Sequence, residues 1–309
     1  GEVHAFMNNL FCFEPIDGMT MHYYADGENP YKLIADELAP GKIGFDKNWA
    51  SKHTISVLKE RDDLIPVLGS DPIDICKSHK DEAEKEALRY AASINDMAVE
   101  FGIKHIDPSL DELTLSNMIE EFFEEHGAVQ DMQLQYVCYG KNAAEPHHGA
   151  VAGEMLKEGD AVLFDLWAPI NNYWCDMTRT VFYKSCSEEH RKVYEIVKAA
   201  QQAAIDFVKP GVKMSDIDAV ARKVISDAGY GEYFLTRTGH GVGMTVHEPP
   251  EASPSCDLIA EPGMCFSIEP GIYLKDDVGV RIEDLVIVTE DGCEVLTKYP
   301  KDLQIVGND

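Results

Sequence analysis

The sequence predicts an α+β fold built from two similar halves. From about residue 75 onward, the order helix, helix, histidine-bearing segment, strand, strand occurs twice. The turns that lead into the two strand pairs also match. Gly159 lies six residues before Asp165, in the first half. Gly263 lies six residues before Glu269, in the second half. Two such halves facing each other would bring equivalent strands together around an approximate two-fold axis.

Residues 1 to about 70 alternate short β and α patterns, which predict a small α/β unit. The expected elements are strands over 3–13 and 42–45 and helices over 30–38 and 49–59, the first helix with proline in its first turn. The looser segment 69–74 holds glycine, serine and proline and precedes a long charged helix. We therefore expect an N-terminal α/β domain over residues 1–74 and a second domain over residues 75–309.

Helical periodicity marks the start of the larger domain. Apolar residues recur at helical spacing over 81–101, which predicts a long amphipathic helix. Thr114 is the expected cap of a second helix, which stops at Gly127 because glycine favours helix ends. The strands that follow are expected over 133–139, 161–167 and 173–183.

The second half repeats this order of elements. Ser187 is expected to cap a helix that ends at residues 209–211. Ser215, with Asp218 three residues on, is expected to start another helix that stops at Gly229. After the histidine-bearing segment, two more strands are expected over 264–274 and 278–289.

Composition narrows the possible partners and the compartment. The formal net charge is −28, and no basic stripe is present, which argues against nucleic acid and anionic membranes as partners. Every apolar run is shorter than the roughly 20 residues that span a bilayer. The eight cysteines form no C-x-x-C pair, so we expect reduced thiols and a cytoplasmic protein.

Two histidines, His240 and His247, lie in a segment interrupted by glycines and closed by two prolines. The glycines at alternate positions over 239–243 disfavour a helix. In a strand, a spacing of seven places the two imidazoles on opposite faces unless a glycine bends the chain. One imidazole can then bind a metal while the other faces a substrate.

Four acidic residues lie within the expected strand pairs. Asp165 and Asp176 belong to the first pair. Glu269 and Glu283 belong to the second pair. An acid inside an apolar strand is costly to bury unless it is paired or bound to a metal.

Two arginines, Arg179 and Arg281, are near enough in sequence to pair with these acids, and any one acid could instead point to solvent. Two arginines do not neutralise four carboxylates, whereas two divalent cations would, with His240 as the one nitrogen ligand. Such a ligand set suits manganese, cobalt, iron or zinc. Two cations roughly 3.5–4 Å apart can hold a bridging water and polarise a carbonyl, which indicates hydrolysis.

Several motifs occur in a fixed order from about residue 75 to the end. They are Phe-Asp at 164–165, Cys-Asp-Met-Thr-Arg-Thr at 175–180, Thr-Gly-His-Gly-Val-Gly at 238–243, Val-His-Glu-Pro-Pro at 246–250, Ile-Glu-Pro-Gly at 268–271 and Gly-Val-Arg-Ile-Glu-Asp at 279–284. In order and spacing the chain resembles the Xaa-Pro dipeptidase (prolidase) and aminopeptidase P branch of the dinuclear metallopeptidases with the pita-bread fold. The resemblance implies that fold for residues 75–309.

The resemblance also implies a metal-binding role for five residues. Asp165 would bind one metal ion. His240 and Glu269 would bind the other, and Asp176 and Glu283 would bridge the two. Manganese is the expected metal, and cobalt, zinc and iron would also suit the site.

Further roles follow from the same resemblance. His147 would contact the substrate near the scissile bond, and His247 would hydrogen-bond the carbonyl oxygen and the tetrahedral oxyanion. Glu269 would take a proton from the bridging water and pass it toward the leaving nitrogen. Arg281 would support the metal ligands electrostatically, or form a plain salt bridge with Asp176 or Asp284. The family also implies a homodimer.

The expected activity is hydrolysis of the Xaa-Pro bond at the N-terminus of dipeptides or short peptides. Methionine aminopeptidases share the glycine-histidine segment, but they usually lack an N-terminal α/β domain and set their last glutamate in a Gln-x-Glu context. A creatinase-like hydrolase and a non-catalytic binding protein of the same fold would both be expected to lack metal ligands, and the five intact candidate ligands disfavour them. One departure is the N-terminal domain, because residues 1–74 resemble only the second half of the family's domain.

Overall fold

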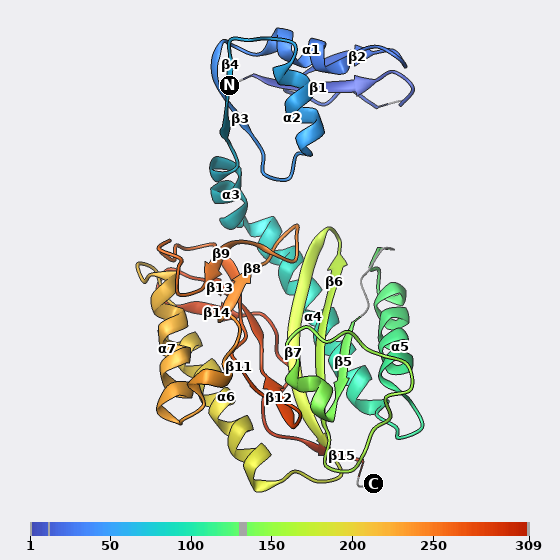
Figure 1. Ribbon diagram of the computed structural model, residues 1–309, viewed down its shortest axis with the longest axis vertical. Coiled ribbons are helices and arrows are strands. Elements are labelled where there is room, and N and C mark those ends of the chain that lie inside the picture. The colour runs from blue at the N-terminus through green and yellow to red at the C-terminus, as the bar shows by residue number, and fades with distance from the viewer. Residues whose placement is uncertain (1, 12, 130–134, 308–309) are drawn as a thin grey trace. The chain divides into compact units, whose positions relative to one another are not determined.

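The computed structural model describes residues 2–11, 13–129 and 135–307 of the chain. The chain divides into two units, Gly1–Ile75 and Cys76–Asp309. Each unit has a hydrophobic core of its own, so each is described separately (Figure 1).

The N-terminal unit contains two pairs of parallel strands and two helices around a small core. The strands are β1 (Val3–Asn8) with β2 (Met19–Tyr24), and β3 (Gly41–Phe45) with β4 (Leu64–Leu68). The helices are α1 (Pro30–Glu37) and α2 (Ser51–Leu58). The fully packed core consists of four apolar side chains, Ala35, Phe45, Val57 and Leu64.

Three features of this unit differ from the sequence prediction. The strand expected over 3–13 ends at Asn8, and β2 and β4 were not predicted. The segment expected to be irregular instead leads into α3 (Asp71–Ser78). Asp71 and Asp74 in the first turn and Lys77 in the last turn complement the helix dipole, which favours a helix here.

The first half of the larger unit begins with two helices. They are α4 (Glu82–Lys104), which Asp81 and Glu84 close with a capping box, and α5 (Glu112–Glu125). The cap of α5 is Asp111 and not Thr114, whose backbone N–H donates to the Asp111 carboxylate at 2.8 Å. The expected stop at Gly127 is confirmed, since this residue follows the helix with φ +94°.

A four-stranded sheet follows these helices, in the order β15-β7-β6-β5. Its strands are β5 (Tyr136–Tyr139), β6 (Ala161–Ile170), β7 (Tyr173–Tyr183) and β15 (Ile305–Val306). Part of the strand expected over 133–139 lies outside the described residues. The short 3₁₀ helix η1 (Gly140–Ala144) connects β5 to the loop before β6.

The second half repeats the pattern with α6 (Glu188–Phe207) and α7 (Met214–Asp227). Ser187 caps α6 as predicted, but α7 already begins at Met214, so Ser215 is not its cap. After η2 (Gly231–Tyr233) comes a five-stranded sheet in the order β14-β13-β10-β8-β9. Its strands are β8 (Gly239–Gly241), β9 (Glu248–Ala252), β10 (Cys265–Ile268), β13 (Asp284–Val288) and β14 (Cys293–Val295). Figure 1 shows α6 and α7 along one side of the larger unit and α5 along the other, with the strands between them.

The two long strands predicted over 264–274 and 278–289 are each broken in two. The first becomes β10 and β11 (Gly271–Leu274), and the second becomes β12 (Val278–Arg281) and β13. At the first break, Glu269 donates its backbone N–H to the carbonyl of Thr238 at 2.7 Å. At the second, Glu283 donates to the carbonyl of Thr178 at 3.1 Å. At the breaks, local pairing is therefore replaced by hydrogen bonds to Thr238, just before β8, and to Thr178 of β7.

Arg179 of β7 connects the two halves behind these breaks. Its buried guanidinium lies 2.7 Å from the Asp284 carboxylate and also donates to the backbone carbonyls of Glu283 and Tyr299. Asp284 accepts further hydrogen bonds from Gln201, Thr297 and Lys301. Among the residues described, no helix is both long and apolar enough to cross a membrane.

Replacing Arg179 by methionine is expected to lower the free energy of unfolding by about 3–5 kcal/mol, because it leaves a buried carboxylate without its main counter-charge. Urea unfolding followed by circular dichroism measures this change. Arg89→Met is the matched control, since the Arg89–Glu294 pair is about one-third exposed and should contribute only about 0.2–1 kcal/mol. Equal losses in the two variants would contradict the assigned role of Arg179.

Candidate active site

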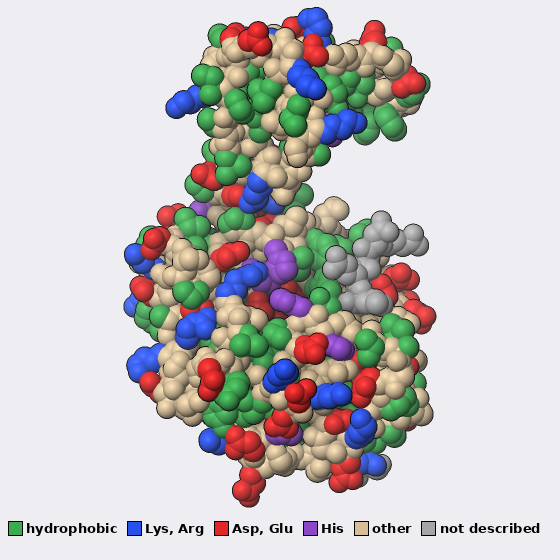
Figure 2. Space-filling view, viewed as in Figure 1, with side chains coloured by type: hydrophobic (Ala, Val, Ile, Leu, Met, Phe, Trp, Pro, Cys, Tyr) green, Lys and Arg blue, Asp and Glu red, His purple; other side chains and the backbone are tan. Residues whose placement is uncertain are grey.

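A cavity of about 470 Å³ lies between the two halves of the larger unit. Side chains from both sheets line it, and they include seven of the eight residues singled out from the sequence: His147, Asp165, Asp176, His240, His247, Glu269 and Glu283. Figure 2 shows histidine side chains gathered at a hollow on this face, with a basic side chain beside them. Residues far apart in the chain thus meet in one place.

The strand register explains why the two aspartates share the cavity. In the antiparallel pair β6–β7, Asp165 lies opposite Thr178 and Trp167 lies opposite Asp176. Side chains alternate along a strand, so all four of these positions are on one face of the sheet.

The same reasoning places the two glutamates side by side. Ile268 pairs with Asp284 before the breaks, and Gly271 pairs with Arg281 after them. An unchanged register sets Glu269 opposite Glu283, each at the point where its strand is interrupted.

Three ligand-type side chains converge most closely. Asp176, His240 and Glu283 each offer one atom, and these atoms lie within 4.8 Å of one another. The Nε2 atom of His240 is also 3.2 Å from Glu269 Oε1. Glu283 accepts a hydrogen bond from Thr178 through Oε2, at 2.7 Å, whereas its buried Oε1 has no partner among the described residues. The geometry leaves a buried carboxylate oxygen facing the cluster.

The electrostatics of this cluster fit bound cations. Burial, followed by repulsion from neighbouring carboxylates, raises the pKa values of Asp176 and Glu283 well above their usual range. Burial raises the pKa of Glu269 to about 7. Burial, and then the nearby His247, lowers the pKa of His240 to about 3, so its imidazole is neutral and keeps a lone pair for a metal. Divalent cations would supply the missing positive charge.

Asp165 differs from the other acids because it has a cationic partner. The Nη2 atom of the buried Arg281 lies 2.5 Å from Asp165 Oδ2. The same guanidinium donates to Thr178 Oγ1 at 2.9 Å, and that hydroxyl in turn donates to Glu283. Arg281 therefore contacts one candidate ligand directly and orients another through Thr178. Within the described residues, Arg281 forms no salt bridge with Asp176 or Asp284.

The two histidines of the glycine-rich segment lie together, not on opposite faces. Their ring centroids are 4.1 Å apart and the rings meet edge to face. The pairing of β8 with β9 is irregular between His240 and Gly241, which turns the chain. Gly241 is required there, because a Cβ atom would lie 2.3 Å from the carbonyl oxygen of Glu248. The sequence predicted opposite faces unless a glycine bends the chain, and the structure shows this bend.

His147 reaches the cavity from the loop after η1. The carbonyl of the preceding Pro146 accepts a hydrogen bond from Arg281 at 3.3 Å, which ties this loop to β12. A Cβ atom on Gly279 of β12 would lie 1.6 Å from the carbonyl oxygen of Ala143, so only glycine lets η1 pack this closely.

One residue of the cavity, Arg237, was missed by the sequence reasoning. It lines the wall beside His247, and its positive charge helps to lower the pKa of that histidine, after burial. In the part of the chain that the structure describes, its side chain forms no hydrogen bond or salt bridge, and its Nε is buried. The only sequence signal was its position three residues before His240.

Comparisons with known proteins agree with this geometry. Residues 86–290 match the family described as metallopeptidase family M24. A putative dipeptidase of Bacillus subtilis is 39% identical over 291 residues, which cover 92% of this chain and 79% of that protein. An Xaa-Pro dipeptidase of Lactobacillus delbrueckii subsp. lactis is also 39% identical, over 293 residues, with the same coverage.

A solved structure is similar as well. Recombinant prolidase from Thermococcus sibiricus superposes with a TM-score of 0.87 and 37% sequence identity, over 94% of this chain and 80% of that one. The resemblance deduced from the motifs is confirmed by these matches. The chain belongs to metallopeptidase family M24 and has the pita-bread fold of its prolidase and aminopeptidase P relatives.

Proposed function

We propose that the chain is a metal-dependent exopeptidase that hydrolyses the Xaa-Pro bond at the N-terminus of dipeptides or short peptides. The observation that carries this proposal is one cavity in which four carboxylates and a neutral imidazole meet. Relatives that share 37–39% of their residues with it are named Xaa-Pro dipeptidases, and these names support the substrate class.

Five residues would hold two divalent cations: Asp165, Asp176, His240, Glu269 and Glu283. Manganese is the proposed metal, and cobalt, zinc and iron are the next candidates, because carboxylate-rich sites with one imidazole suit these ions. Bound at this site, the cations would make water a stronger nucleophile near neutral pH and polarise the scissile carbonyl.

The protein's own side chains would then transfer the proton of the attacking water and stabilise the negative charge on the oxyanion. We assign to Glu269 the transfer of a proton from the attacking water to the leaving nitrogen, and Ser267 Oγ holds its Oε1 by donating at 3.0 Å. His247 lines the cavity, where desolvation, followed by the charge of Arg237, lowers its pKa, so it is neutral and can donate one N–H to the developing oxyanion. His147 would contact the substrate beside the scissile bond.

Arg237 is expected to make the enzyme prefer dipeptides to longer peptides. A dipeptide carries a free carboxylate on its proline, one residue beyond the scissile bond. A guanidinium without an acidic partner can bind such a group through two charge-assisted hydrogen bonds. Tyr136 and Trp167, whose rings meet edge to face with centroids 4.6 Å apart, form an aromatic wall of the same cavity and would accommodate the proline ring.

We also propose a homodimer that works in the cytoplasm. The seven cysteines of the described residues are all free thiols, which supports a reducing compartment. Support for the dimer comes from large apolar side chains exposed on the N-terminal unit, among them Leu10, Phe11, Phe13 and Ile16.

The activity is tested with protein stripped by a chelator and then reconstituted with manganese. We expect cleavage of an Xaa-Pro dipeptide, slower cleavage of an Xaa-Pro-Xaa tripeptide, and none of Met-Ala or creatine. Asp176→Asn serves as the control that should lose both bound metal and turnover. Rapid cleavage of Met-Ala would favour a methionine aminopeptidase, and creatine hydrolysis would favour a creatinase-like enzyme. Metal binding without any cleavage would favour a non-catalytic relative.

His247→Ala is expected to lower kcat by about 10²–10³, since it removes one donor to the oxyanion. The metal content should stay at the wild-type value, because His247 is not among the assigned ligands. Steady-state kinetics and elemental analysis on the same preparation measure both quantities. His105→Ala, which changes an exposed histidine outside the cavity, is the control. A loss below tenfold would rule out the oxyanion role.

Arg237→Met is expected to reduce kcat/KM for an Xaa-Pro dipeptide roughly 10- to 150-fold, the equivalent of about 1.5–3 kcal/mol for hydrogen bonds to a charged group. The corresponding dipeptide amide lacks the carboxylate, so wild type and variant should cleave it at similar rates. Arg191→Met, at an exposed arginine, should change neither rate. Equal losses on the acid and the amide would show that Arg237 does not bind the carboxylate.

A further inference from the structure

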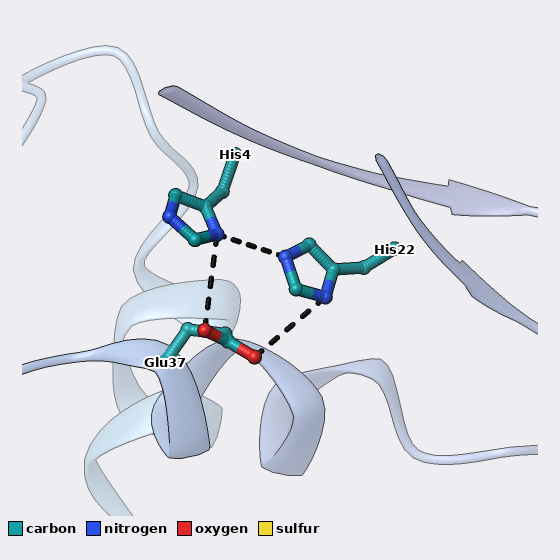
Figure 3. A group of neighbouring side chains, drawn as sticks. All are labelled: His4, His22 and Glu37. Carbon is teal, nitrogen blue, oxygen red and sulfur yellow. Dashed lines mark hydrogen bonds and ion pairs between the residues drawn. The ribbon is translucent and has the colours of Figure 1, made fainter. Parts of the chain in front are cut away.

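A second group of ligand-type side chains lies within the N-terminal unit and consists of His4, His22 and Glu37 (Figure 3). In the parallel pair β1–β2, His4 lies opposite Thr20 and Phe6 lies opposite His22. The two histidines are therefore diagonal neighbours on one face of the strands. Glu37, the last residue of α1, faces both of them.

The distances in this trio suit a shared cation. His4 Nδ1 and His22 Nε2 are 2.8 Å apart, the length of a hydrogen bond between the two imidazoles. The two oxygens of Glu37 are 3.8 Å from His4 Nδ1 and 3.7 Å from His22 Nδ1, which is beyond hydrogen-bonding length. One atom from each residue can be chosen so that all three lie within 4.8 Å of one another. A carboxylate thus approaches both imidazoles without bonding to either.

A cation would need only small movements to enter. Zinc–nitrogen bonds of about 2.0–2.1 Å in a tetrahedral shell set neighbouring ligand atoms roughly 3.3 Å apart. If the cation bound His4 Nδ1 and His22 Nε2, these two nitrogens would separate by about 0.5 Å, and Glu37 Oε2 would move about 0.5 Å closer to His4 Nδ1. The present contact of Glu37 with His22 is to the other ring nitrogen, Nδ1, so the His22 ring or the carboxylate would also have to turn.

A neighbouring aromatic ring already holds one of the two imidazoles in place. The ring of His22 stacks on Phe6 with centroids 4.6 Å apart. The other nitrogen of His4, Nε2, lies 3.6 Å from the carboxylate of Glu2. This distance is also beyond hydrogen-bonding length, so Glu2 would have to move closer to become the outer carboxylate partner that usually orients a metal-binding imidazole. The side chains of His4 and His22 are 24% and 15% exposed, so water can reach a fourth position.

We propose that His4, His22 and Glu37 bind one transition-metal cation of the zinc class, with water completing a tetrahedral shell. The site is separate from the catalytic cavity and does not depend on the proposed peptidase activity. Its effect is structural, because the cation would link β1, β2 and the end of α1. Such a link matters in a unit whose fully packed core consists of Ala35, Phe45, Val57 and Leu64.

The test is a count of bound zinc on the intact chain of residues 1–309 after equilibrium dialysis. His22→Gln and His4→Gln are each expected to hold one equivalent fewer than the wild type, whatever number the catalytic cavity binds. His53→Gln is the matched control, since His53 lies in the same unit but hydrogen-bonds Tyr31 at 2.8 Å. It should keep the wild-type content. Circular dichroism confirms that each variant is folded, and Glu37→Gln replaces any variant that is not.

A second readout follows the stability of the unit. Added zinc should raise the melting temperature of the wild type and of His53→Gln by the same amount, and a smaller amount in His22→Gln. Equal zinc content in wild type, His22→Gln and His4→Gln would overturn the proposal and leave a hydrogen-bonded histidine pair. A loss in His53→Gln as large as in His22→Gln would also overturn it, because zinc would then bind surface histidines without preference.

Discussion

The burial of four carboxylates in one cavity is the constraint on which the rest of the larger unit depends. Arg281 neutralises Asp165, while Asp176 and Glu283 are left facing each other with raised pKa values. Such a cluster must either take up protons or bind additional positive charge. The surrounding structure keeps the ligands at fixed positions. The broken strands carry the two glutamates, and the chain bends between His240 and Gly241. The Arg179–Asp284 ion pair joins the two halves behind the second break.

The two halves contribute to this arrangement in different ways. The first half presents its acids from an unbroken pair of strands, so the aspartates are positioned by register alone. In the second half the strands break at Glu269 and Glu283, whose backbone N–H groups bond to the carbonyls of Thr238 and Thr178. Arg179 and Asp284 lie directly behind the second break and join the halves. The approximate symmetry of the sequence therefore yields a site whose two sides are built differently.

Much of this could be predicted from the sequence, because the signals were local. The helix cap at Ser187, the helix end at Gly127 and the alternating strands depend on neighbours within a few residues. The caps expected at Thr114 and Ser215 were wrong. The motifs and the resemblance they carry were enough to select seven of the residues that line the cavity. The strand breaks and the partner of Arg281 depend on groups far away in the chain. Arg237 was missed for a related reason, since the lack of a partner is visible only in three dimensions.

The candidate ligands are drawn from both halves, from Asp165 to Glu283, which are 118 positions apart (283 minus 165). A cation held by both ends would bind only the folded chain, so its binding free energy would add to the stability of the folded state. The same ions would then be needed for catalysis and for the stability of the larger unit. Loss of metal would abolish the activity and also weaken the interface between the two halves.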